Sequence, residues 1–111
     1  MDEILRGSTL LFDPRMSALL HLVEYTKSVQ EACSFMQISY STAWHMLNRV
    51  EDELVFPLVM HNRGGASGNR TILTEKGKPV MDAYDKFSEQ VKEEADLLYR
   101  NFFHDPIYSH E

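Results

Sequence analysis

The stretch SVQEACSFMQISYSTAWHMLNRVEDE, residues 28–53, decides the fold. Ser28 followed three residues later by Glu31 has the pattern of a capping box, which predicts the start of a short helix. Residues 37–39 favour a turn, and the apolar spacing after them predicts a further helix over residues 40–53. Two helices joined by so short a turn indicate a helix-turn-helix.

Apolar residues recur at helical spacing along both predicted helices and give each helix one buried face. These residues are Val29, Ala32, Cys33 and Met36 on the first helix and Ala43, Leu47, Val50 and Leu54 on the second. We expect Ile38, in the turn, to pack in the angle between the two helices.

The second helix also carries side chains that suit contacts with DNA. A helix fits the major groove, where hydroxyl, amide, imidazole and guanidinium groups can hydrogen-bond bases or phosphates. Ser39 is the predicted N-cap of this helix. The candidate DNA-binding residues in this region are Ser39, Tyr40, Ser41, Thr42, Trp44, His45, Asn48 and Arg49.

Two of these residues have an alternative structural interpretation. Trp44 either packs between helices or forms a platform against the DNA backbone. Arg49 either contacts DNA or pairs with Asp52 or Glu53 about one turn later on the same helix.

Upstream of the helix-turn-helix, Asp13-Pro14 predicts the start of a first helix, with Asp13 as the N-cap and Pro14 at the first helical position. Apolar residues at helical spacing continue this helix to about Lys27. Residues 9–12 before it favour a short strand or an apolar arm.

Downstream, Pro57 ends the helical pattern because proline has no backbone N–H to donate. Residues 58–61 and 71–73 are predicted as two short strands, joined by a flexible, basic tip over residues 62–70. Such a hairpin forms the wing of a winged helix and is expected to contact the DNA backbone or the minor groove. The candidate contacts in the wing are Arg63, Gly64, Gly65, Asn69 and Arg70.

Thr74 is the predicted cap of a long last helix that extends to about Phe103, and Pro79 is expected to delay or bend its start. Its apolar residues recur at spacings of three and four, close to a heptad seam with one stutter. Because the rest of the chain is too small to cover this stripe, we expect two subunits to share it. The predicted dimer interface comprises Val80, Tyr84, Phe87, Val91, Ala95, Leu98 and Phe102.

These elements predict a mainly α fold with a small β-hairpin wing: a winged helix-turn-helix plus a long C-terminal dimerisation helix. We expect a DNA-binding head over residues 1–76, the dimerisation helix over residues 77–103 and a tail over residues 104–111.

The formal net charge of −6 argues against DNA binding, because nucleic-acid binders usually carry a basic footprint. The distribution of charge matters more than the total. Residues 77–111 carry a net charge of −4, whereas residues 54–76 carry +2, and residues 32–50 and 54–74 contain no Asp or Glu. One face of the protein can therefore still meet a polyanion.

Composition and motif content argue against several other classes of protein. A single cysteine excludes an intrachain disulfide, and five histidines without paired ligand spacing argue against a metal site. No apolar run approaches the ~18 residues that span a bilayer, so we expect a cytoplasmic protein without a membrane partner. We expect neither an enzyme nor a cofactor, because the chain has no nucleophile paired with a base and no phosphate loop.

Several short motifs occur in the order known from one family of regulators. The run Val50-Glu51-Asp52-Glu53-Leu54, followed by Pro57-Leu58, is similar to the end of the recognition helix in LysR-type regulators. Over residues 10–103 the chain resembles the N-terminal domain of ModE-type molybdate-responsive regulators. The motifs that carry this resemblance are Leu11-Phe12-Asp13-Pro14-Arg15, Ile38-Ser39-Tyr40-Ser41-Thr42-Ala43-Trp44, Pro57-Leu58-Val59, Gly64-Gly65 and Leu73-Thr74-x-x-Gly77.

The resemblance implies a winged-helix regulator that dimerises through its last helix and binds a two-fold symmetric operator. Two departures concern sequence preference: the wing has fewer glycines than in the family, and His45 stands where LysR-type proteins often carry arginine. The sequence ends after the last helix, so we expect a stand-alone domain without the family's molybdate-binding domains. The residues that match family contact positions are Tyr40, Ser41, Trp44 and His45 at bases or adjoining backbone, and Gly64, Gly65 and Arg70 in the wing.

The leading hypothesis from the sequence is a homodimer that binds double-stranded DNA sequence-specifically and regulates transcription. The alternative is a winged-helix protein-interaction module that has lost DNA binding and acts through its last helix and wing. A third hypothesis is an orphan domain that pairs with a separately encoded effector protein.

Overall fold

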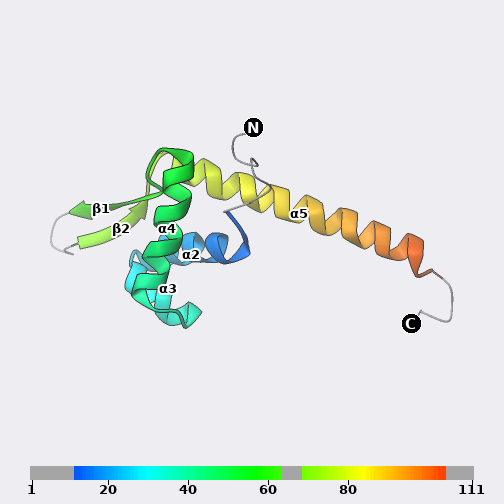
Figure 1. Ribbon diagram of the computed structural model, residues 1–111, viewed down its shortest axis with the longest axis horizontal. Helices are drawn as coiled ribbons and strands as arrows, with labels where there is room; N and C mark the ends of the chain where they lie inside the picture. Colours follow the sequence, from blue (N-terminus) through cyan, green and yellow to red (C-terminus); the bar gives the residue numbers. More distant parts are fainter. Residues whose placement is uncertain (1–11, 64–68, 105–111) are drawn as a thin grey trace.

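Short helices, a hairpin and one long helix follow one another along the chain in the computed structural model, which describes residues 12–63 and 69–104 (Figure 1). This order confirms the predicted winged helix-turn-helix with a hairpin wing and a long last helix. The elements are α2 (Pro14–Thr26), α3 (Val29–Met36), α4 (Tyr40–Leu54), β1 (Val59–Arg63), β2 (Asn69–Leu73) and α5 (Gly77–Phe102).

Polar side chains fix the starts of the three head helices, because each accepts a hydrogen bond from a backbone N–H that has no partner within its helix. The three bonds run from Met16 N to Asp13 Oδ1 (3.0 Å), from Glu31 N to Ser28 Oγ (3.0 Å) and from Thr42 N to Ser39 Oγ (3.1 Å). The predicted caps are confirmed, but only half of the predicted capping box forms. The N–H of Ser28 donates to Thr26 Oγ1 (3.1 Å), so it is already satisfied without Glu31.

The same three helices end at residues in the left-handed region, none of which is glycine. These residues are Lys27 (φ 62°), Gln37 (φ 58°) and Val55 (φ 67°). Each N–H bonds back to a carbonyl three or four residues earlier, which satisfies the last turn of the helix. Helix α4 therefore ends at Leu54, one residue later than predicted.

Helix α2 lies at the centre of the core, and its Leu19, Leu20 and Val23 are completely buried. Helices α3 and α4 pack onto it through the predicted apolar faces, including Ala32 and Leu47. The residues at the edges of these faces are only partly buried: Met36, Ile38 and Leu54.

The two strands of the wing are longer than predicted. Strand β1 begins at Val59 rather than residue 58, and the ladder continues to Arg63, which pairs with Asn69. The predicted tip over residues 62–70 is thus corrected: its first and last two residues belong to the strands, and residues 64–68 lie outside the described part. Backbone pairing extends the ladder beyond the apolar residues from which the strands were predicted.

The base of the wing is hydrogen-bonded to the head. Thr71 N donates to Lys27 O (2.9 Å), which joins β2 to the end of α2. Thr74 donates its N–H to Leu58 O (2.9 Å) and its hydroxyl to Pro57 O (2.7 Å). The hairpin is therefore held at its base against the helix-turn-helix.

Helix α5 begins at Gly77, after a turn that Thr74 stabilises by accepting the N–H of Gly77 on Oγ1 (2.9 Å). The N-cap of α5 is Lys76, which makes no side-chain capping bond, so the prediction that Thr74 caps this helix is wrong: Thr74 stabilises the turn before it, and the helix starts two residues later than a cap at Thr74 would place it. Most of α5 projects away from the head, on the side opposite the wing (Figure 1). The radius of gyration is accordingly 17.9 Å, against ~13 Å for a compact domain of roughly this length.

Candidate nucleic-acid interface

The exposed side of α4 presents one line of polar side chains. Each residue of a helix is rotated by about 100° from the one before it, so Ser41, His45 and Asn48 lie on the same side of α4. All three side chains are exposed. Thr42 and Arg49, also exposed, flank this line on one side. The five residues form a continuous polar strip on the face opposite the core.

Hydroxyl groups cluster at the N-terminus of this strip. Ser39 Oγ donates to Thr42 Oγ1 (2.8 Å) and lies 3.2 Å from Ser41 Oγ. All three residues are exposed. The N-terminal end of a helix carries a partial positive charge, so this end of α4 offers both hydroxyl groups and a favourable dipole to an anion or a base edge.

Trp44 and Tyr40 form an aromatic pair beside the strip. Their ring centroids are 6.2 Å apart with an interplanar angle of 72°, an edge-to-face contact. Trp44 is partly buried against the core, whereas Tyr40 is 53% exposed. Part of the Trp44 side chain is therefore covered by the core, and its exposed part lies next to the ring of Tyr40.

Arg49 lines a small hollow of about 130 Å³ between the start of α2 and α4. Arg15, from the first turn of α2, lines the same hollow, together with the carboxylate-bearing Asp13. In the part of the chain that the structure describes, Arg49 makes no ion pair with Asp52 or Glu53. Two arginines from different helices therefore border one edge of the polar strip, and Arg15 was not among the residues predicted to bind DNA.

Acidic side chains occupy only the C-terminal end of α4. Glu51 accepts the backbone N–H of Leu58 on Oε2 (2.7 Å), so its carboxylate fixes the connection to the wing. Asp52 and Glu53 are exposed. The negative charge of α4 is thus separated along the helix from the hydroxyl-rich N-terminus.

In the wing, Arg70 is exposed and pairs in register with Asn62, which is exposed as well. Asn62 was predicted only as part of the tip, because its sequence neighbours gave no strand signal. Arg63 and Asn69 pair at the end of the ladder, and their placement is described for the backbone alone. Gly64 and Gly65 lie outside the described residues.

Cys33 lies beneath the turn of the helix-turn-helix, where it is 5% exposed. Its thiol lies 3.7 Å from Ser39 O, toward which it donates. Burial raises the pKa of this thiol, and a hydrogen bond with the backbone of Cys33 itself partly opposes the shift. The neutral thiol is therefore part of the packing under the N-terminus of α4.

The residues predicted for the dimer interface divide into two groups on α5. Val80 and Tyr84 are partly buried against the head of their own chain, and the Tyr84 ring packs on Phe12 at 5.1 Å. Burial raises the pKa of Tyr84, with smaller contributions from the negative charges of Asp13 and Asp85. The residues that remain exposed are Phe87, Val91, Ala95, Leu98 and Phe102.

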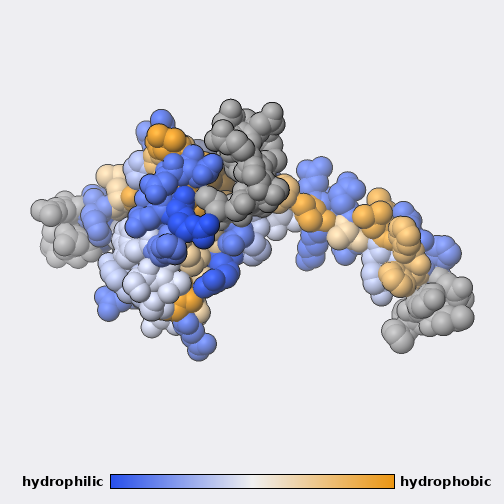
Figure 2. All heavy atoms as spheres, viewed as in Figure 1, coloured by the Kyte–Doolittle hydropathy of each residue, from blue (hydrophilic) through white to orange (hydrophobic). Residues whose placement is uncertain are grey.

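Figure 2 shows hydrophobic surface along the outer part of α5, whereas hydrophilic residues predominate on the visible face of the head. None of the helices within residues 12–63 and 69–104 combines the length and the apolar character that a membrane-spanning helix requires. Among the described residues, no group of three or more His, Cys, Asp or Glu side chains is arranged to hold a metal ion.

Comparison with curated proteins finds relatives named ModE, although no protein-family model matches the chain. A transcriptional regulator ModE of Haemophilus influenzae is 30% identical over 86 residues, which cover 78% of this chain and 33% of that protein. The DNA-binding transcriptional dual regulator ModE of Escherichia coli K12 is 28% identical over 89 residues, 80% of this chain and 34% of that protein.

A third relative, the molybdenum transport protein ModE of Azotobacter vinelandii, is 29% identical over 90 residues, which cover 81% of this chain and 33% of that protein. The chain thus spans about a third of the length of the curated relatives it matches.

Proposed function

This chain is a ModE-type winged helix-turn-helix domain, and from that premise we propose that it is a homodimeric regulator of transcription that binds double-stranded DNA sequence-specifically. The E. coli relative is named as a DNA-binding regulator, and the shared region includes most of this chain. We propose the same activity here, with the head over residues 1–76 as the DNA-binding part and the helix over residues 77–103 as the dimerisation part.

The observation that carries the proposal is the polar, acid-free N-terminal half of α4. Ser41, His45 and Asn48 form one exposed line, and the acidic residues of the helix follow only after Arg49. A helix that enters the major groove presents its N-terminal residues to the base edges. We propose that this line contacts bases, and that Ser39, Thr42 and Arg49 contact the adjoining backbone.

The wing and the aromatic pair extend the proposed interface. Arg70 is exposed on β2, and Arg63 ends β1 beside the tip, so both are proposed to contact phosphates. Gly64, Gly65 and Asn69 are proposed as backbone contacts of the wing. Tyr40 and Trp44 are proposed to pack against sugar and phosphate, which apolar ring surfaces can do without reading sequence.

A second copy of the chain is the proposed occupant of the apolar stripe on α5. Phe87, Val91 and Leu98 are each about half exposed, and they border a shallow groove of about 420 Å³ that Ala95 also lines. The stripe has near-heptad spacing, so a second α5 offers a complementary surface. Dimerisation would give two α4 helices related by a two-fold axis, which matches a two-fold symmetric operator.

The direct test is titration of the protein with a random pool of duplexes and with sequences selected from that pool, at two salt concentrations. Because phosphate contacts release counterions, log affinity should fall against log salt with a slope of about −0.9 per contact. Selected duplexes should bind more tightly than random ones by at least about a thousandfold. Binding weaker than ~10 µM on every duplex at low salt, the order expected of non-specific contacts, would refute the proposal.

A pair of variants separates DNA binding from the alternative of a protein-interaction module. Arg49→Ala combined with Arg70→Ala should weaken binding to the selected duplex and reduce the salt slope by about two, without changing the dimer. Arg100→Ala, which removes an exposed charge near the outer end of α5, is the matched control and should leave the slope unchanged. Equal behaviour of both variants would favour the protein-interaction module.

A further inference from the structure

Helix α5 leaves the head at Asp85. Gly77 and Met81, earlier on the helix, are buried, and Asp85 is its last residue that is partly buried. Every described residue from 86 to 104 is exposed. Within residues 12–63 and 69–104, the hydrogen bonds of Asp85 are therefore the last ones that join α5 to the head, and they can fix the direction in which the exposed part of the helix points.

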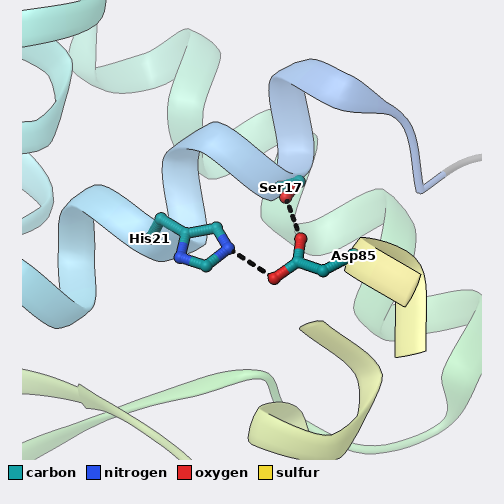
Figure 3. A network of polar contacts seen from close by, with 3 residues as sticks. All are labelled: Ser17, His21 and Asp85. Atoms are coloured by element: carbon teal, nitrogen blue, oxygen red, sulfur yellow. Dashed lines mark hydrogen bonds and ion pairs between the residues drawn. The ribbon is translucent and has the colours of Figure 1, made fainter. Parts of the chain in front are cut away.

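Asp85 meets two side chains of α2 at this exit. Its Oδ1 accepts the hydroxyl of Ser17 (3.1 Å), and its Oδ2 lies 2.7 Å from His21 Nε2. Figure 3 shows the carboxylate of Asp85 between Ser17 and His21, so that both of its oxygens are used. Ser17 and His21 are one turn apart on α2, and these three residues are called the exit clamp below.

The ion pair and the ring contact that also hold α5 to the head lie nearer the start of the helix or are made through apolar surface. Lys78 Nζ forms an ion pair with Glu24 Oε2 (2.9 Å) in the first turn of α5. The contact between Tyr84 and Phe12 is a ring packing at 5.1 Å, which tolerates sliding more readily than a hydrogen bond does. Among the described side chains, only the exit clamp holds α5 by directional bonds at its point of exit.

We infer that the exit clamp sets the angle between the head and the dimerisation helix, and that it thereby selects the spacing between the two DNA half-sites. This inference rests on the proposed function as a DNA-binding dimer. Ser17, His21 and Asp85 are positioning residues in this role, since none of them belongs to the proposed DNA interface.

The geometry makes the spacing sensitive to this angle. From Asp85 to Phe102 the helix is about 26 Å long, at 1.5 Å per residue. A rotation of about 8° at Asp85 moves its far end by about 3.6 Å, slightly more than the ~3.4 Å between successive nucleotides of one strand. If two subunits are joined through this part of α5, the same rotation changes the distance between their two α4 helices by a similar or larger amount.

The test uses the selected operator in a series of duplexes whose two half-sites lie one or two base pairs closer together or further apart. Wild-type protein should prefer one spacing by at least about tenfold, because half-site spacing is geometrically fixed in such dimers. Asp85→Ala should lose this preference, or move it by one base pair, while binding to an isolated half-site stays within about twofold, since no phosphate or base contact is removed.

Three further variants distinguish a positioning role from a loss of stability. Asp85→Asn can still accept from Ser17 and can donate to His21 in the other imidazole tautomer, so it should restore the wild-type preference. His21→Leu removes one bond of the clamp and should give an intermediate preference. Lys78→Met removes the ion pair with Glu24 between the same two helices and should leave the preference unchanged.

A measurement without DNA tests the angle directly. Spin labels on Gln30→Cys in α3 and Glu93→Cys in α5, in a Cys33→Ala background and diluted with unlabelled chain, report the distance between the head and α5 within one subunit. Asp85→Ala should shift or broaden this distance relative to wild type and Asp85→Asn.

The possible results separate the two proposals. Failure of wild-type protein to bind any duplex would refute the proposed function, while the label distances would still decide whether the clamp sets the angle. If wild type binds and Asp85→Ala keeps both its spacing preference and its label distance, the inference is wrong and the proposed function stands.

Discussion

Gly77 and Val55 each have an unusual backbone position: Gly77 has no room for a side chain, and Val55 has a positive φ although it is not glycine. A Cβ on Gly77 would lie 2.5 Å from Leu58 O and 3.0 Å from Leu58 Cα, so the start of α5 packs on the backbone before β1 more closely than any side chain allows. Val55 has a β-branched side chain at φ 67°, a region that costs such residues strain, and 85% of its surface is exposed.

Gly77→Ala should lower the free energy of unfolding by about 1–3 kcal/mol, because Leu58 or the start of α5 must move. Glycine to alanine within a helix usually stabilises by about 0.5–1 kcal/mol, so the expected sign is reversed here. Urea denaturation measures the change, and Glu75→Ala, at an exposed position in the turn before α5, is the control. A Gly77→Ala variant as stable as wild type would show that this close contact is not rigid.

Val55→Gly should raise the free energy of unfolding by about 0.5–1 kcal/mol, because glycine adopts the left-handed region without strain and this gain exceeds the added entropy of the unfolded chain. Val55→Ala keeps the Cβ and should give no comparable gain. The two variants are compared by thermal and urea denaturation. A gain from alanine equal to that from glycine would assign the effect to the exposed side chain instead.

At the scale of elements, α5 performs two tasks along its length. Its first turns bury Gly77 and Met81 against the head and place Tyr84 on Phe12. Beyond Asp85 it makes no contact that buries a side chain among the described residues. The first part of the apolar stripe on α5 thus packs against the core of its own chain. The part beyond Asp85 is proposed to pack against a second chain.

Leu98→Glu should weaken the proposed dimer by at least about tenfold, because a charge placed within an apolar seam must be desolvated or expelled. Leu97→Glu introduces the same charge on a neighbouring residue that lies off the stripe and has a similar exposure of 53%. Sedimentation equilibrium over a concentration series compares the two. A wild-type protein that sediments as a 12.9 kDa monomer at tens of micromolar would contradict the dimer.

At the scale of the whole molecule, the elongated shape places the acidic outer part of α5 away from the polar strip on α4 and the wing. The longest dimension is 61 Å, and the exposed part of α5 points away from the wing (Figure 1). Residues 77–111 carry −4 of the net charge of −6. Charges on the outer part of α5 are screened from the head at physiological salt, where the Debye length is about 8 Å.

A variant with Glu89→Gln, Glu93→Gln and Asp96→Asn should bind DNA several-fold more tightly than wild type at ~10 mM salt, where the Debye length is about 30 Å. At ~150 mM salt the difference should fall below about twofold. Fluorescence anisotropy at both salt concentrations measures it. A gain that persists unchanged at the higher salt would mean that these acids lie close to the bound DNA.

Much of the fold could be predicted from local sequence alone, because helix caps and apolar spacing act over only a few residues. Asp13, Ser28 and Ser39 each cap the helix that the sequence assigned to them. The ends were less predictable, since left-handed residues such as Gln37 and Val55 carry no sequence signal when they are not glycine. The strands likewise extend past their apolar residues because cross-strand pairing decides their length.

The sequence by itself determined the helix-turn-helix, the polar strip on α4 and the apolar stripe on α5, since each depends on periodicity within one element. Only the tertiary structure decided how that stripe is divided, because the burial of Val80 and Tyr84 depends on where the head lies. It alone brought Arg15 beside Arg49 and placed Asp85 between Ser17 and His21. Such contacts join residues far apart in the chain, and no local spacing specifies them.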